Sequence, residues 1–241
     1  MKQYKAVFID WDDTIGDFHG AADLALKEMF DKYTLDLYFA SLEEFVGLYK
    51  PHNLELWAKY GEDKVTKEYL SLDRFLFPLM HGSKVCERLK TKSERVAVTA
   101  LAEQLSEDFL NLTTAHFSLL PGAEDLVRYL ANKYPLTIVT NGFIEVQYEK
   151  FDKSGLKECF SHIVLSEEVG CQKPNPRIFE EALCMNELAA EDVVMIGDSL
   201  TSDVLGAQRA GIDQIWVTNA DKANGDATYI VNSLEEVKDI L

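Results

Sequence analysis

The chain has 241 residues, of which 47% are hydrophobic and 27% are charged, and its formal net charge is −17. This balance predicts a soluble globular protein with a substantial core, and no apolar run approaches the roughly 18 residues of a membrane-spanning helix. The negative charge excludes nucleic-acid polymers and anionic membranes as expected partners, but a local cation can still attract a small anionic substrate.

The first element in chain order is the apolar run Lys5–Asp10, inside the N-terminal segment MKQYKAVFID. This run has the length of a buried strand. The segment lacks the long apolar stretch and the small-residue cleavage site of a signal peptide. We therefore expect a strand here and a cytoplasmic protein.

Four further apolar runs of strand length follow in the second half of the chain. They are Leu136–Thr140, His162–Ser166, Val193–Gly197 and Gln214–Thr218. Helix-like stretches accompany them at Glu124–Lys133 and Pro176–Leu188, and the tail Ser233–Leu241 has the pattern of a final capped helix. This alternation predicts an α/β fold in which helices cover both faces of a doubly wound parallel sheet.

The segment 18–118 interrupts this alternation, because it contains no convincing buried strand. Two sets of its apolar residues follow helical spacing: Phe18, Ala22, Ala25, Met29 and Tyr33, then Val98, Leu101, Leu105, Phe109 and Leu112. We predict an α-helical domain at 18–118, inserted into a discontinuous core domain of 1–17 and 119–241. Gly16 and Pro121-Gly122 are candidate hinge positions between the two, because Gly and Pro interrupt regular structure.

Polar side chains stand where three of the apolar runs end. The first run ends at Asp10, the second ends at Thr140, and Asp198 follows the fourth. In an open parallel sheet, ligands bind outside the carboxyl ends of the strands, so these three residues would meet in one crevice. Thr140 or Asp198 alone could equally be the N-cap of the next helix.

The first strand is expected to end in a crowd of negative charge, because Asp12 and Asp13 follow Asp10 closely. Carboxylates in such a position repel one another and are costly to remove from water, so a cation should lie beside them. Lys173 precedes a predicted helix and could reach the crevice, although a loop lysine alone is usually solvated. Asp203, five residues after Asp198, would alone be typical of a helix surface.

Four stretches, in chain order, resemble the motifs of haloacid dehalogenase superfamily phosphatases. Asp10-Trp11-Asp12-Asp13-Thr14 resembles the D-x-D-x-T first motif, and Thr140 in Ile-Val-Thr-Asn-Gly resembles the second. Lys173 resembles the third motif, and Asp198 with Asp203 in Gly-Asp-Ser-Leu-Thr-Ser-Asp resembles the fourth. The resemblance covers the whole chain and implies subfamily I, whose helical C1 cap is inserted after the first motif.

The resemblance implies a Mg²⁺-dependent phosphomonoester hydrolase that works through an aspartyl-phosphate intermediate. Asp10 would be the nucleophile, and Asp12 would protonate the leaving oxygen and then deprotonate the attacking water. Asp10, the backbone carbonyl of Asp12 and Asp198 would bind Mg²⁺, a set of oxygen ligands that suits this ion. Asp203 would stabilise the metal site without binding the ion directly.

The resemblance also assigns the residues that bind the phosphoryl group. Thr140 and the backbone of Asn141 would bind its oxygens, and Lys173 would neutralise both the phosphate and the nucleophile. One position departs from the pattern, because many members of the family carry Gly where this chain has Asp13. Acidic residues also occur there in the family, so activity is still expected.

Several stretches resemble the bacterial pyrimidine 5′-nucleotidase branch of this family. They include Thr140–Phe143, Ser166–Gly170 and, in the inserted segment, Lys50–Trp57. This resemblance implies a nucleoside 5′-monophosphate as the small phosphorylated substrate. Trp57 could stack on its base and Arg74 could hydrogen-bond the edge of the base, but Trp57 could equally belong to a packed helical core.

Other functions remain open at this point. A phosphatase or phosphomutase for a small sugar phosphate or phosphoglycolate would share all four motifs. A 2-haloacid dehalogenase resembles D-x-Y-x-T in the first motif, whereas this chain has Asp12. A receiver-like protein that binds phosphate without catalysis carries its acceptor on a middle strand and lacks a long insertion. The sequence does not indicate the oligomeric state.

Overall fold

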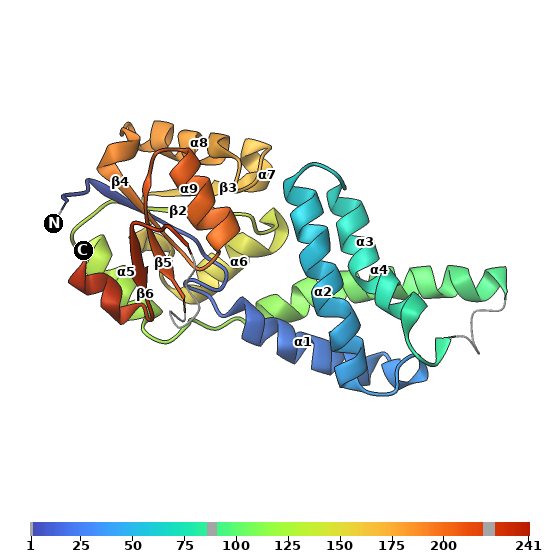
Figure 1. The fold of residues 1–241 in the computed structure, drawn as a ribbon. Coiled ribbons are helices and arrows are strands. Elements are labelled where there is room, and N and C mark those ends of the chain that lie inside the picture. The colour runs from blue at the N-terminus through green and yellow to red at the C-terminus, as the bar shows by residue number, and fades with distance from the viewer. Residues whose placement is uncertain (1, 86–90, 219–224) are drawn as a thin grey trace. The chain divides into compact units, whose positions relative to one another are not determined.

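The computed structural model describes residues 2–85, 91–218 and 225–241. The chain divides into two compact units, and each is described here by itself. The core unit comprises Met1–Phe18 and Phe117–Leu241, and the helical unit comprises His19–His116. Figure 1 shows that the first and last parts of the chain share the core unit and that the helical unit comes from the segment between them.

Six strands form one sheet in the core unit, and every pair of neighbours is parallel. Their order is β3-β2-β1-β4-β5-β6. The strands are β1 (Ala6–Ile9), β2 (Leu136–Thr140), β3 (His162–Leu165), β4 (Val193–Gly197), β5 (Asp213–Val217) and β6 (Tyr229–Val231). The predicted doubly wound α/β fold and its five strands are confirmed, whereas the short edge strand β6 was not predicted.

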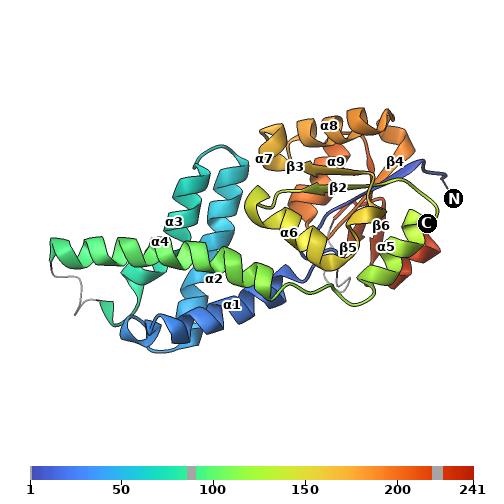
Figure 2. The same cartoon turned by 180° about the vertical axis from the view of Figure 1, so that it is seen from behind.

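Helices cover both faces of this sheet (Figure 2). Because side chains alternate along a strand, Val7 and Ile9 pack in one cluster, while Ala6 and Phe8 pack in another. Residues of α5 (Ala123–Ala131) and α6 (Ile144–Ser154) join the first cluster, and residues of α8 (Pro176–Asn186) and α9 (Leu205–Arg209) join the second. The short helix α7 (Ser166–Val169) follows β3 directly. The sheet is therefore buried from both sides, which explains the almost continuous apolar runs.

The C-terminal tail differs from the prediction of a capped helix at Ser233–Leu241. It forms only a 3₁₀ turn, η7 (Glu235–Asp239), and no side chain caps it. Of its three buried residues, Leu234 and Val237 are three positions apart, which matches the three residues per turn of a 3₁₀ helix, and the third is Leu241. The tail therefore covers the sheet with this tighter turn.

The helical unit contains most of α1 (Phe18–Lys32) and all of α2 (Leu42–Gly61), α3 (Lys67–His81) and α4 (Lys92–Ala115). The side chains of Ser41, Thr66 and Thr91 cap the last three helices. Its core is aromatic, since the rings of Tyr49, Phe75 and Phe109 lie 5.0 to 5.6 Å apart. Among the described residues, no helix is long and apolar enough to cross a membrane.

Candidate active site

Three predicted site residues lie together because their strands are neighbours. Strand β1 lies between β2 and β4, and Ile9 pairs with Ile138 on one side and with Ile196 on the other. The backbone N–H of Asp10 donates to the carbonyl of Ile196 at 2.9 Å. Asp10, Thr140 and Asp198 therefore stand at the same edge of the sheet, where ligands bind in parallel α/β proteins.

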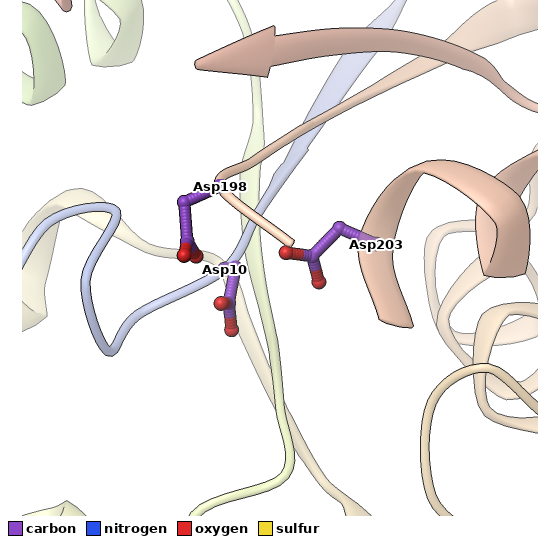
Figure 3. A group of neighbouring side chains, drawn as sticks. All are labelled: Asp10, Asp198 and Asp203. Atoms are coloured by element: carbon purple, nitrogen blue, oxygen red, sulfur yellow. The ribbon is translucent and has the colours of Figure 1, made fainter. Parts of the chain in front are cut away.

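Three carboxylates form the centre of the site. One carboxylate oxygen from each of Asp10, Asp198 and Asp203 lies within 4.8 Å of the other two. Figure 3 shows that Asp10 and Asp198 come from the loops after their strands, whereas Asp203 reaches in from the helical segment η5 (Leu200–Val204). An all-oxygen set of this kind is suited to a hard divalent cation such as Mg²⁺.

Lys173 is the cation that the structure places among these carboxylates. Its ammonium group lies 2.6 Å from Oδ1 of Asp10 and 2.7 Å from Oδ1 of Asp203, and the residue is only 3% exposed. Burial by itself would lower the pKa of Lys173, but attraction to the two carboxylates outweighs burial and raises it. Lys173 therefore remains charged and fixed between its two partners.

One lysine does not balance three carboxylates. Burial raises the pKa of Asp10 well above its ordinary value, and repulsion by Asp203 adds to this effect while Lys173 opposes it. Burial, followed by repulsion from Asp203 and Asp13, raises the pKa of Asp198 to about 7. This excess of negative charge is what a bound divalent cation would offset, so the donor set fits Mg²⁺.

Asp203 differs from the other two carboxylates because both of its oxygens are already engaged. Lys173 donates to Oδ1, and the backbone N–H of Ser199 donates to Oδ2 at 3.0 Å. A Cβ at position 197 would overlap with the Asp203 side chain, so Gly197 provides the space for it. Asp10 and Asp198 are therefore the better candidates for direct metal ligands, with Asp203 holding Lys173.

Thr140 ends β2 and Asn141 begins the loop after it, where the motif comparison predicts phosphate binding. The amide of Asn141 accepts from the backbone N–H of Lys173 at 2.8 Å and donates to its carbonyl at 2.9 Å. The side chain of Asn141 thus fixes the loop that carries Lys173. The hydroxyl oxygen of Thr140 accepts from the N–H of Gly142 at 3.2 Å, which holds this turn closed.

Asp12 has two partners on α6 that were not predicted from the sequence. Lys150 Nζ lies 3.0 Å from Oδ1 of Asp12, and the amide of Gln147 donates to Oδ2 at 2.9 Å. Gln147 and Lys150 are three positions apart and thus share one helix face. Two long polar residues at this spacing, beside the buried Val146 and Phe151, are the sequence signal that could have indicated them.

Asp13 adopts a left-handed backbone conformation with φ of 61°. Its N–H donates to the carbonyl of Gly16 at 2.7 Å and closes the turn after β1. This conformation explains why glycine suits the position, and Asp is among the few other residues that tolerate it. The departure from the family pattern therefore keeps the turn and adds a charge that raises the pKa of Asp198.

The two predicted substrate contacts in the helical unit have different surroundings. Trp57 is half-buried on α2 and lies edge-on to Tyr60, with 5.8 Å between the ring centroids. Arg74 on α3 is 2% exposed, donates to the hydroxyl of Ser106 at 3.2 Å and lies over the rings of Phe75 and Phe109. The structure therefore corrects the prediction for Arg74, because its guanidinium packs inside the unit instead of facing a substrate.

Magnesium should stabilise the protein more at pH 8 than at pH 6. The native pKa of Asp198 is about 7, against an ordinary value of 3.8, so the metal-free native state holds a proton that the unfolded state loses. The stability contributed by this proton is complete below about pH 4 and is lost as the pH rises through 7. Since a ligand must be ionised, the proton competes with the metal below pH 7.

Thermal unfolding at both pH values, with and without Mg²⁺, measures this difference. The rise in Tm caused by Mg²⁺ should be larger at pH 8, and the pH dependence should be much weaker in the Asp198→Asn variant. Equal rises at the two pH values in the parent protein would contradict the assignment of Asp198.

The chain matches known families over nearly its whole length. The sequence profile of the haloacid dehalogenase-like hydrolases matches residues 4–211. HAD-hydrolase YfnB of Bacillus subtilis is 35% identical over 245 residues, which cover 100% of this chain and 97% of that protein. A crystal structure of YfnB bound to magnesium has a TM-score of 0.82 at 32% identity and covers 100% of this chain and 99% of that one.

Two further relatives carry names that state a substrate. Pyrimidine 5′-nucleotidase YjjG of Escherichia coli is 30% identical over 241 residues, which cover 98% of this chain and 96% of that protein. Glyceraldehyde 3-phosphate phosphatase of Methanothermobacter thermautotrophicus is 30% identical over 249 residues, which cover 98% of this chain and 99% of that protein. Both similarities extend over the core unit and the helical unit.

Proposed function

Because the chain belongs to the haloacid dehalogenase-like hydrolase family, we propose that this phosphoric monoester hydrolase acts on nucleoside 5′-monophosphates with Mg²⁺ as cofactor. The nucleotide substrate is supported by the similarity to a pyrimidine 5′-nucleotidase. This similarity extends over the helical unit. We propose this helical unit as the cap that selects the leaving group. The chemistry itself belongs to the core unit.

The proposed reaction has two steps with balanced proton transfers. In the first, an oxygen of Asp10 bonds to phosphorus while the ester P–O bond breaks, and Asp12 gives its proton to the leaving nucleoside oxygen. In the second, water attacks the phosphorus of the aspartyl-phosphate and gives a proton to Asp12. The Asp10–phosphorus bond then breaks, inorganic phosphate leaves, and both carboxyl groups return to their starting states.

The surrounding residues would stabilise the charge that develops on the phosphoryl oxygens. Lys173 already contacts Asp10 at 2.6 Å, so its charge lies beside the bond that forms. Thr140 and the backbone of Asn141 would donate to the phosphoryl oxygens. Bound Mg²⁺, held by Asp10, Asp198 and the Asp12 carbonyl, would supply a Lewis acid at the same oxygens.

A sugar phosphate is the second candidate substrate. The similarity to a glyceraldehyde 3-phosphate phosphatase is as high in identity and covers as much of the chain as the similarity to YjjG. The four motifs serve both reactions equally, so the cap decides between them. Trp57 on α2 is a candidate for stacking on a base, whereas Arg74 is too buried to contact the edge of that base.

A panel of phosphate esters tests this proposal. Pyrimidine and purine nucleoside 5′-monophosphates should be hydrolysed with kcat/KM at least about tenfold above that of glyceraldehyde 3-phosphate and other sugar phosphates. Turnover should stop when a chelator removes the metal and return when Mg²⁺ is added. A higher kcat/KM for a sugar phosphate than for any nucleotide would show that the substrate is a sugar phosphate. Full activity in the presence of the chelator would contradict the requirement for Mg²⁺.

A further inference from the structure

We propose that Gln147 and Lys150 of α6 are positioning residues that hold the carboxyl group of Asp12, which gives its proton to the leaving oxygen and regains one from the attacking water. The proposal rests on the function proposed above, because it takes Asp12 as the proton donor. It adds two residues from an element that carries none of the four motifs. The argument starts from the way in which the carboxylate of Asp12 is held.

Each oxygen of Asp12 has its own donor. Lys150 binds Oδ1 at 3.0 Å and Gln147 binds Oδ2 at 2.9 Å. The two donors are 2% and 0% exposed, whereas the side chain of Asp12 is 24% exposed. Fixed donors on both oxygens set the position and the plane of a carboxyl group that is still partly exposed.

These two polar residues are costly as core residues. A buried lysine and a buried amide each lose their contacts with water, and apolar side chains of similar volume would be easier to bury. Oδ1 of Asp12 is the only partner that the ammonium of Lys150 ion-pairs with among the described residues. The Gln147 carbonyl oxygen has no hydrogen-bond partner there. The ammonium of Lys150 also lies 5.0 Å from the ring centroid of Phe18. The contacts to Asp12 are the feature that the two buried polar residues share, and we take these contacts as the reason for their burial.

The amide of Gln147 also connects Asp12 to the phosphate-binding loop. Its nitrogen donates to the hydroxyl oxygen of Thr140 at 3.1 Å as well as to Asp12. A Cβ at position 142 would overlap with this amide, so Gly142 leaves the space that Gln147 occupies. One side chain thus fixes the separation between the proposed proton donor and the hydroxyl proposed to hold the phosphoryl group.

The first step of the reaction is where the proposed role can be measured separately, because only this step involves the leaving group. As the ester P–O bond breaks and the Asp10–phosphorus bond forms, the proton of Asp12 passes to the leaving oxygen. A misplaced Asp12 slows this step when the leaving group is a nucleoside alkoxide, which must be protonated. It matters little for p-nitrophenolate, which leaves readily as an anion.

Leaving-group dependence tests this role. We compare kcat/KM for a nucleoside 5′-monophosphate and for p-nitrophenyl phosphate, because kcat/KM reports no step after phosphoryl transfer to Asp10. In Gln147→Leu and Lys150→Met, the value for the nucleotide should fall about 10²-fold, the usual effect of a misplacement near 1 Å. The value for p-nitrophenyl phosphate should fall less than about threefold in Lys150→Met. It should fall somewhat more in Gln147→Leu, which also loses the hydrogen bond to Thr140, but still by much less than the value for the nucleotide. The ratio of the two is unaffected by any loss of folded protein.

Two control variants complete the design. Lys153→Met removes another lysine from α6, one that is exposed and paired with Glu149, and should leave the ratio unchanged. Lys150→Arg keeps a cationic donor and should restore most of the parent ratio. Equal losses for both substrates in Gln147→Leu and Lys150→Met would overturn the proposal and leave a structural role, and a faster nucleotide reaction would also overturn it.

Asp12→Asn separates a failure of this inference from a failure of the proposed function. If Asp12 is the proton donor, this variant shows the same selective loss with the nucleotide. A selective loss in Asp12→Asn but not in the α6 variants rejects the positioning role alone. No selective loss in Asp12→Asn rejects the proton donor of the proposed function, and the positioning role with it.

Discussion

The Asp10→Asn variant should be inactive and yet at least as stable as the parent protein. An amide cannot act as the nucleophile, so kcat should fall by about 10⁴-fold or more, as in other enzymes that lose a covalent nucleophile. The fold should not suffer, because burial and repulsion by Asp203 already disfavour the charged form of Asp10. Lys173 should keep its second partner in the variant, Asp203, which lies 2.7 Å away in the parent protein.

Three measurements check this expectation: phosphate release, thermal unfolding without metal at pH 8, and trapping of the phosphorylated enzyme in acid. The parent protein should carry a labelled acyl phosphate after mixing with substrate, and the variant should carry none. Asp192→Asn is a matched control, because Asp192 precedes β4 at its amino end and pairs with Lys5 at 3.0 Å. Normal turnover by Asp10→Asn would contradict the proposed chemistry.

The strands at the centre of the sheet could be predicted because helices cover them on both sides. Buried parallel strands are almost continuously apolar, and β1, β2 and β4 each consist entirely of buried residues. The edge strand β6 has only three residues, of which Ile230 is exposed and only Val231 is buried, so it has no such pattern. The strands that are buried in the middle of the sheet could therefore be predicted from the sequence, whereas the partly exposed edge strand could not.

Helix α6 was not predicted for a reason that concerns the site. Its buried face carries Val146 and Phe151, but also Gln147 and Lys150, so the apolar spacing of a helix is broken. The sequence distance between Lys150 and Asp12 is 138 positions, and no local pattern relates them. The two buried polar residues that we propose to position Asp12 are therefore also the residues that obscure this helix in the sequence, a conflict between local pattern and fold that is typical of functional sites.

The strand ends and the helical unit differ in how far the sequence could predict contacts. Asp10, Thr140 and Asp198 could be placed together because the topology of a parallel sheet brings their strands' carboxyl ends to one edge. No such rule applies to α3, which packs against both α2 and α4 and therefore buries two faces. Arg74 and its neighbour Phe75 are both buried for this reason, which periodicity alone does not reveal.

Replacing Lys173 by Met should have the opposite effect on stability to that of Asp10→Asn. The parent site holds three buried or half-buried carboxylates and one ammonium group. The Asp10 variant removes a negative charge, whereas Lys173→Met removes the positive charge that Asp10 and Asp203 share. Breaking a buried ion pair from one side costs about 3–5 kcal/mol, because the remaining charge is left uncompensated. The variant should be less stable by about this amount at pH 8 without metal.

The pH and the metal should then modify the stability of Lys173→Met in a defined direction. Without Lys173, the pKa of Asp10 loses its main lowering influence and rises further above its ordinary value. Protonation at pH 5.5 then relieves the repulsion, so the deficit in unfolding free energy should shrink as the pH falls.

Mg²⁺ at pH 8 should restore part of the stability, while kcat stays about 10²–10³-fold low. Urea unfolding at both pH values measures these differences, with Lys157→Met, a half-buried lysine paired with Asp152 outside the site, as control. A stability equal to that of the parent at pH 8 would show that the ammonium group does not compensate these carboxylates.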